Sequence, residues 1–122
     1  MSGGGAQALV AAVCKVPLLG EALAASFEGI AELRSFPGEL EDIDGLLRSL
    51  HPDAVVVDSR SQAAQAEPYA RASQAPLVHV LLREQKLRVL RNGDWEADDS
   101  DGASAEAIRN AVVAGLYGRQ PV

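Results

Sequence analysis

The sequence predicts an α/β domain whose sheet is mainly parallel and covered by helices. Continuous apolar runs, such as Ala54–Val57, are typical of strands that are buried on both faces. Segments in which apolar residues recur at helical spacing alternate with these runs, which is the pattern of an α/β fold. The chain has 122 residues, 48% of them hydrophobic and 23% charged, so it can form one packed core but not two ordinary domains.

The first half of the chain predicts three strands and two helices in alternation. Residues 8–14 are apolar throughout and predict the first strand. Pro17 suits the first turn of a helix over residues 17–27. The predicted buried face of this helix consists of Leu18, Leu19, Ala22, Leu23 and Phe27. Residues 31–36 predict the second strand.

A second helix and a third strand follow. Acidic residues at its start favour a helix over residues 39–50. The turn at Pro52 and Asp53 then leads into the third strand, residues 54–57, which stops at Asp58. In open α/β sheets, ligands bind at the carboxyl ends of the strands, so Asp58 lies where a functional group is expected.

The next segment predicts a change of pattern. Residues 59–74 predict a short or irregular helix that breaks near Pro68. Residues 77–83 predict a fourth strand, which only Glu84 and Gln85 separate from a fifth. A crossover to a parallel strand needs about a dozen residues, so this connection must be an antiparallel hairpin.

The end of the chain predicts one more strand and a helix. The fifth strand covers residues 86–91, and the Asn92-Gly93 turn leads to a brief strand over residues 94–97. A solvated acidic loop over residues 98–102 precedes Ser104, the predicted cap of a helix over residues 105–117.

Right-handed crossovers would place helices on both faces of this sheet, in a doubly wound, flavodoxin-like arrangement with a C-terminal antiparallel hairpin and a final helix. We expect a flexible lead over residues 1–7 and a single domain over residues 8–119.

Composition excludes several classes of function. The net charge of −6, without a run of basic residues, disfavours direct binding to nucleic acid or to an anionic membrane. The single cysteine, Cys14, cannot form an internal disulfide and is predicted to be a buried thiol. His51 and His79 have no metal-site spacing. The sequence shows neither a transmembrane segment nor a secretory signal, so we expect a cytoplasmic protein.

Between about residues 8 and 76, the chain resembles the receiver domains of bacterial response regulators. The resemblance rests on the order of two segments, VCKVPLLGEALAASFE and LLRSLHPDAVVVDS, in which Pro52, Asp53 and Asp58 match the family pattern. It implies a receiver-like fold, in two-component signalling or a phosphorelay, with Asp58 at the phosphoacceptor position.

Other parts of the family's site are replaced. Receivers hold Mg²⁺ with an acid pair after the first strand, where this chain has Cys14 and Lys15. The family's Ser or Thr at the end of the fourth strand corresponds to Leu81, which has no hydroxyl group. The resemblance therefore implies a pseudo-receiver without catalytic residues, metal or cofactor.

Two arrangements of Lys15 are open. Its ammonium group could lie beside Asp58 and supply the positive charge that a metal otherwise supplies. Alternatively, Asp58 caps the turn that follows it, and Lys15 is solvated at the entrance to the helix.

The predicted hairpin is a candidate interaction surface. Lys86, Arg88 and Arg91 form a small basic strip near Trp95, a composition favoured at protein interfaces. The alternative is an ordinary edge strand that its charges protect from aggregation.

We therefore expect a non-enzymatic regulatory module that contacts a protein partner or forms a homodimer. No DNA-binding domain is expected to follow, because the chain ends at Val122, so a role in transcription regulation would depend on a partner. Two alternatives are an atypical phosphoacceptor receiver and a small-molecule-binding or enzymatic α/β domain that uses the crevice near Cys14 and Asp58.

Overall fold

The computed structural model describes residues 8–38, 40–91, 93–98 and 102–117. The elements, in chain order, are β1 (Leu9–Cys14), α1 (Pro17–Ser26), β2 (Glu32–Pro37), α2 (Ile43–Leu50), β3 (Ala54–Val57), α3 (Arg60–Ser73), β4 (Leu77–Leu81), β5 (Lys86–Arg91), β6 (Asp94–Asp98) and α4 (Ala105–Tyr117). The predicted lead over residues 1–7, most of the acidic loop and Gly118 lie outside the described residues.

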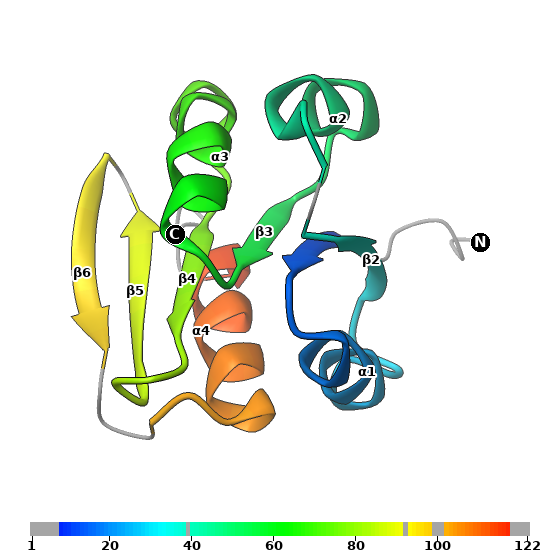
Figure 1. Ribbon diagram of the computed structural model, residues 1–122, viewed down its shortest axis with the longest axis vertical. Helices are drawn as coiled ribbons and strands as arrows, with labels where there is room; N and C mark the ends of the chain where they lie inside the picture. The colour runs from blue at the N-terminus through cyan, green and yellow to red at the C-terminus, as the bar shows by residue number, and fades with distance from the viewer. Residues whose placement is uncertain (1–7, 39, 92, 99–101, 118–122) are drawn as a thin grey trace.

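The strands form one six-stranded mixed sheet in the order β2-β1-β3-β4-β5-β6 (Figure 1). Strands β2, β1, β3 and β4 are parallel to one another, whereas β5 pairs antiparallel with β4, and β6 pairs antiparallel with β5. The α/β class and the antiparallel hairpin are therefore confirmed. Because the sheet is mixed, the finer flavodoxin-like assignment stays a prediction.

Helices cover both faces of the sheet (Figure 1). Helices α1 and α4 pack on one face, where Leu23, Phe27 and Ile108 belong to the first hydrophobic cluster. Helices α2 and α3 pack on the other face, where Leu47 and Tyr69 belong to the second. Strands β1 and β3 contribute side chains to both clusters, because successive residues of a strand point to opposite faces.

The predicted face of α1 is partly wrong. Leu19, Leu23 and Phe27 are buried, as their spacing of four residues predicts, but Leu18 is 72% exposed and Ala22 is also exposed. Leu18 lies in the first turn, and its position on the helix directs it away from the sheet.

Helix α2 begins later than predicted. Asp42, not an acid near residue 39, is the N-cap, and its carboxylate accepts a 2.9 Å hydrogen bond from the Gly45 N–H. The helix ends at His51, which adopts a left-handed backbone conformation with φ of 54° and is exposed.

The predicted break at Pro68 is wrong, because α3 runs through this residue without interruption. Residues on both sides of Pro68 anchor the helix: Ala66 and Ala70 are buried, and the Tyr69 hydroxyl donates a 2.8 Å hydrogen bond to the Pro52 carbonyl. Tertiary packing thus overrides the preference of proline for a helix end.

The last part of the chain follows the prediction closely. Strand β4 ends at Leu81, two residues earlier than expected, and Asp98 belongs to β6 rather than to a loop. Ser104 accepts a 3.1 Å hydrogen bond from the Ala107 N–H, which confirms it as the cap of α4. Gly115 packs directly on Pro76 of the same chain. None of the helices that the structure describes is both long enough and apolar enough to cross a membrane.

Candidate functional site

The residues singled out by the sequence gather at the carboxyl ends of three neighbouring parallel strands. Cys14 ends β1, Asp58 directly follows β3, and Leu81 ends β4. Loops from these strands lead to the first turns of α1 and α3 and to the β4–β5 hairpin. This end of the sheet is the candidate site.

The Asp58 carboxylate binds the backbone of the loop between β1 and α1. Its Oδ1 accepts a 2.8 Å hydrogen bond from the Lys15 N–H, and its Oδ2 accepts one of 3.1 Å from the Val16 N–H. Both carboxylate oxygens are thus engaged by two successive amides. Asp58 therefore connects the strand β3 to the entrance of α1.

Neither predicted arrangement of Lys15 and Asp58 is correct in full. Within the ranges that the structure describes, the Lys15 ammonium group forms no ion pair with Asp58, and the Lys15 side chain is exposed. The solvated lysine is thus as expected, but Asp58 does not cap the turn that follows it. Ser59 has that role, since its hydroxyl accepts a 3.3 Å hydrogen bond from the Gln62 N–H at the start of α3.

Gln62, which the sequence did not mark as a site residue, extends the connections around Asp58. Its Oε1 accepts a 3.1 Å hydrogen bond from the Asp58 N–H, and its Nε2 donates one of 3.3 Å to the Gly38 carbonyl. Gln62 is almost completely buried, which is unusual for a polar side chain and requires such partners. The network therefore ties together the loops that follow β1, β2 and β3.

A second aspartate holds the opposite end of β1. The Asp53 carboxylate accepts a 2.9 Å hydrogen bond from the Leu9 N–H, and the Asp53 N–H donates one of 2.7 Å to the Leu9 carbonyl. Asp53 precedes β3 and Asp58 follows it, so the two acids that flank β3 bind the two ends of β1.

Cys14 is a buried thiol, as predicted, with 5% of its surface exposed. Burial, and to a smaller extent the charge of Asp58, raises the pKa of Cys14 to about 12. A thiol with this pKa is protonated near neutral pH and is a poor nucleophile or metal ligand.

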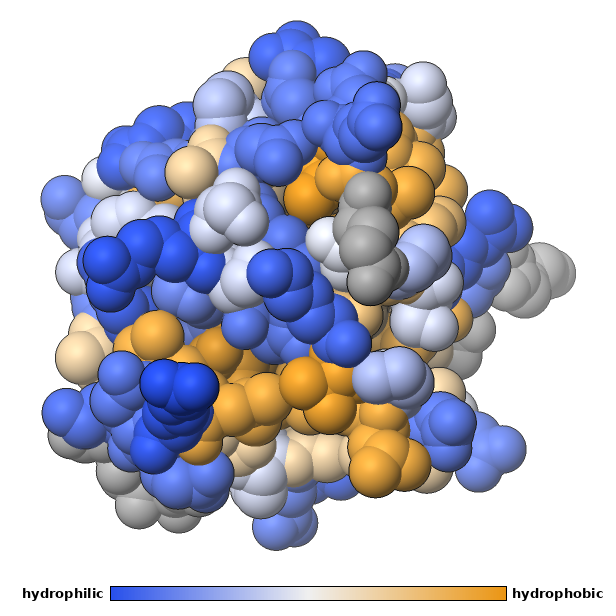
Figure 2. Space-filling model, in the orientation of Figure 1, coloured by the Kyte–Doolittle hydropathy of each residue, from blue (hydrophilic) through white to orange (hydrophobic). Residues whose placement is uncertain are grey.

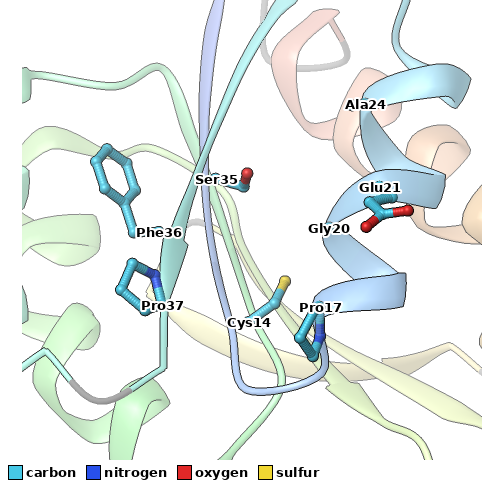
Figure 3. Close-up of a pocket in the computed structure, with 8 residues that line it drawn as sticks. All are labelled: Cys14, Pro17, Gly20, Glu21, Ala24, Ser35, Phe36 and Pro37. Carbon is cyan, nitrogen blue, oxygen red and sulfur yellow. The ribbon is translucent and has the colours of Figure 1, made fainter.

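Cys14 borders a pocket of about 410 Å³ between α1 and β2 (Figure 3). The Cys14 sulfur and the Ser35 hydroxyl point toward α1, whereas the Phe36 ring points away from it (Figure 3). Gly20 and Ala24 form part of the helical wall. The pocket is mainly apolar and lies on the α1 face of the sheet.

A second pocket, of about 460 Å³, lies beside Asp58. Asp58, Ser59 and Arg60 line it from the β3–α3 connection, and His79 and the residues up to Glu84 line it from β4 and the hairpin. His79 is only 3% exposed. Burial, followed by the charges of Arg88 and Arg60, lowers its pKa, while Asp58 and Glu84 act in the opposite direction.

The predicted basic strip on the hairpin is divided between two faces of the sheet. Lys86 and Arg88 alternate with Leu87 and Val89 along β5, and the Arg88 guanidinium lies 4.6 Å from the centroid of the Trp95 ring. Arg91 belongs to the opposite face, where it forms a 3.2 Å ion pair with Glu96. The structure thus stacks Arg88 on Trp95 and places Lys86 on the same face of β5, whereas Arg91 lies on the other face.

Two exposed apolar residues, which the sequence did not predict, lie at the entrance to α1. Val16 is 40% exposed, and Leu18 is the most exposed large hydrophobic residue in the described chain. Figure 2 shows that apolar residues reach the surface in the region of α1 and α4, within a largely hydrophilic face.

In residues 8–38, 40–91, 93–98 and 102–117, no group of three or more His, Cys, Asp or Glu side chains is placed to hold a metal ion. Leu81 places an aliphatic side chain at the end of β4. The arrangement offers structural hydrogen bonds around Asp58 and two small pockets.

Comparisons with protein-family models, with curated proteins and with solved structures found no significant match to this chain.

Proposed function

We propose that this chain is a non-catalytic regulatory module with a receiver-like, flavodoxin-like fold, and that it acts through protein–protein contacts. The order of its four parallel strands, β2-β1-β3-β4, and the helices on both faces support this fold assignment. The observation that carries the functional proposal is the engagement of both Asp58 carboxylate oxygens by backbone amides.

A phosphoacceptor needs a free carboxylate oxygen that can attack phosphorus, and a cation that neutralises the moving charge. Asp58 already uses both oxygens to hold the β1–α1 loop. At the positions of the family's acid pair, the chain has the protonated thiol of Cys14 and the exposed side chain of Lys15. These features favour a structural role for Asp58.

The contact surface that we propose is the face of the β5–β6 ribbon that carries Lys86, Arg88 and Trp95. A guanidinium stacked on an indole ring forms a preorganised pair of the residue types that are enriched at interface centres. Arg91 lies on the other face, where it pairs with Glu96, and is not part of this surface. The partner is another protein or a second copy of this chain.

Treatment with a small phosphodonor and Mg²⁺, followed by intact-mass analysis, tests the non-catalytic role. We expect no phosphorylated species in the native protein or in Asp58→Asn. A phosphorylated native protein whose label disappears in Asp58→Asn would show that the chain is an active phosphoacceptor.

A contact through the ribbon is tested by sedimentation equilibrium of the native protein, of Trp95→Ser and of Glu21→Gln, an exposed control on α1. If the partner is a second copy, Trp95→Ser weakens dimerisation while Glu21→Gln does not. A dimer that is equally stable in all three proteins would place the contact elsewhere.

The pocket beside Cys14 favours a second candidate function, the binding of a small apolar molecule. Its volume of about 410 Å³ lies within the range of known ligand sites. A ligand that binds only the folded state raises the melting temperature. A metabolite panel should therefore contain a compound that stabilises the native protein but not Gly20→Leu, which fills the pocket. A panel without such a compound would leave the regulatory proposal as the single candidate.

A further inference from the structure

The two edge strands of the sheet, β2 and β6, differ in their charges (Figure 1). Strand β6 reads DWEAD and carries three acids without a basic residue. Strand β2 reads ELRSFP and carries one acid and one base. An edge with charges of one sign repels a second copy of itself, because like charges directly opposite each other are destabilising. Of the two edges, only β2 has a charge pattern that a second copy could match.

The outer side of β2 presents backbone hydrogen-bonding groups. The Glu32 N–H donates a 2.8 Å hydrogen bond to the Ala8 carbonyl, so the backbone groups of Glu32 face β1. The N–H and C=O groups of successive residues in a strand point alternately to its two sides. Those of Leu33 and Ser35 therefore point away from β1, where the described chain offers no further strand. They can form a ladder with a strand of another molecule.

Two charged side chains lie beside these backbone groups, on one face of β2. Glu32 and Arg34 are two residues apart, so both lie on the α2 face of the sheet, and a 3.2 Å ion pair joins them. Each side chain is 56% exposed. Each can therefore approach a second opposite charge without losing the first.

An antiparallel second copy of β2 matches this charge pattern in one register. If a two-fold axis passes between the two Leu33 residues, Glu32 of each copy lies directly opposite Arg34 of the other copy. These are the closer, non-hydrogen-bonded pairs of an antiparallel ladder, and the four charges alternate around the axis. The smallest shift that keeps the outward backbone groups paired is two residues. In one direction it places Arg34 opposite Arg34, and in the other it places Glu32 opposite Glu32.

The backbone and the apolar side chains suit the same register. With Leu33 opposite Leu33, the N–H of each copy donates to the carbonyl of the other, because both groups point outward. The Ser35 N–H lies opposite Ala31 of the other copy, the residue before β2, and donates to its carbonyl. The Leu33 side chain is only partly buried, on the α1 face, and would meet its equivalent across the axis.

We propose that this chain forms a two-fold symmetric dimer in which β2 pairs antiparallel with β2 of a second copy, so that the two sheets become one. The edge selects a second copy over an unrelated strand, because its charges complement themselves in this register and oppose the neighbouring registers. This contact lies at the opposite edge of the sheet from the β5–β6 ribbon and does not depend on the contact proposed there.

Charge reversal tests the pairing of the side chains. Glu32→Arg and Arg34→Glu each place like charges opposite each other, and each should weaken dimerisation by about tenfold in sedimentation equilibrium. An equimolar mixture of the two variants should form a heterodimer, because every basic side chain then faces an acid. The double variant should dimerise like the native protein. If the single variants dimerise normally, or if their mixture associates no better than either variant alone, the proposal is wrong.

Ser35→Pro tests the backbone ladder separately. Proline removes the outward N–H but no hydrogen bond to β1, so the fold and its far-UV circular dichroism spectrum should be retained. Dimerisation should weaken by about tenfold, whereas Ser35→Ala, which keeps the N–H, should leave it unchanged. A folded Ser35→Pro that dimerises like the native protein would contradict the pairing of β2 with β2.

Trp95→Ser distinguishes this dimer from a contact through the ribbon. Because β6 and β2 are at opposite edges of the sheet, Trp95→Ser should leave the dimer that depends on Glu32 and Arg34 unchanged. A native protein that stays monomeric up to about 1 mM would overturn the proposal. So would a dimer that Trp95→Ser weakens and Arg34→Glu does not, since that dimer would form through the ribbon.

Discussion

The Asp58 Oδ1 lies 2.8 Å from the backbone nitrogen of Lys15, so the Asp58 carboxylate binds the main chain of Lys15 and not its ammonium group. The same carboxylate also accepts a hydrogen bond from the Val16 N–H. The acid therefore acts as a side-chain cap for a loop that lies 43 residues earlier in the sequence. The contribution of this contact to the free energy of unfolding should depend on the carboxylate oxygens of Asp58 and not on the ammonium group of Lys15.

Substitution at Asp58 should destabilise the fold, while substitution at Lys15 should not. Asp58→Ala leaves two loop amides without their acceptor and should lower the free energy of unfolding by about 1 to 2 kcal/mol, because water replaces the bonds only in part. Lys15→Ala should change it by less than about 0.5 kcal/mol. Urea denaturation measures both values.

The double variant separates a main-chain contact from an ion pair. With a main-chain contact, the effects of Asp58→Ala and Lys15→Ala add. Glu21→Ala, an exposed acid on α1, controls for the loss of negative charge. Strong non-additivity between Asp58 and Lys15 would contradict this account and restore the ion pair.

The thiol of Cys14 should make stability depend on pH in alkaline solution. Its pKa is about 12 in the folded state and 9.0 in its ordinary state, so the folded protein keeps a proton that the unfolded chain loses between these values. Below pH 9 this group contributes no pH dependence. Above it, the free energy of unfolding should fall by about 1.4 kcal/mol per pH unit until the folded thiol also ionises.

Comparison with Cys14→Ala isolates this effect from the titration of tyrosines and lysines. The native protein should show the steeper decline between pH 9 and 12, as measured by urea denaturation at several pH values. Parallel curves for the two proteins would mean that the thiol ionises equally well in both states.

Gly115 should tolerate no larger residue. A Cβ atom at this position would lie 2.7 Å from the Pro76 Cβ, so Gly115→Ala must move α4 or the loop before β4. We expect a loss of about 1 to 3 kcal/mol in the free energy of unfolding. Ala114→Ser, on the exposed side of α4, should change it by less than about 0.5 kcal/mol. A stabilised Gly115→Ala would show that helix propensity outweighs the close contact.

Replacing Pro68 should stabilise the protein. The residue is exposed within α3 and has no N–H to continue the helical hydrogen bonding. Pro68→Ala should raise the free energy of unfolding by about 1 kcal/mol or more, and increase the melting temperature accordingly. A destabilised variant would mean that the pyrrolidine ring limits the unfolded chain more than it disturbs the helix.

The sequence predicted the elements that have strong local patterns. The apolar runs of β1 and β3, the short β4–β5 connection and the Ser104 cap all carry signals that a few adjacent residues define. Pro68 shows the limit of such signals. The burial of Ala66 and Ala70 against the sheet is a tertiary effect, and it overrides the local preference at Pro68.

The sequence predicted that Cys14, Asp58 and Leu81 lie at strand ends, but it did not predict the hydrogen bonds that Asp58 forms. The resemblance to receivers placed Asp58 near the β1–α1 loop, but any residue has a backbone amide, so the sequence could not show that Asp58 binds backbone. Gln62 was missed for a related reason, because a buried glutamine in a polar segment has no distinguishing pattern. The ion pairs of the arginines likewise depend on distances that only the fold defines.

Asp53 and Asp58 flank β3, a strand of only four residues, and bind backbone amides at the two ends of the neighbouring β1. Both pairs of partners can meet only if β1 and β3 keep their present lengths. Insertion or deletion of one residue in either strand would leave one of the acids opposite the wrong amide. The centre of the sheet is therefore expected to be intolerant of changes in length. Natural variation in length, and sites for inserting a reporter peptide, should accordingly lie outside β1, β3 and the loops that Asp53 and Asp58 hold.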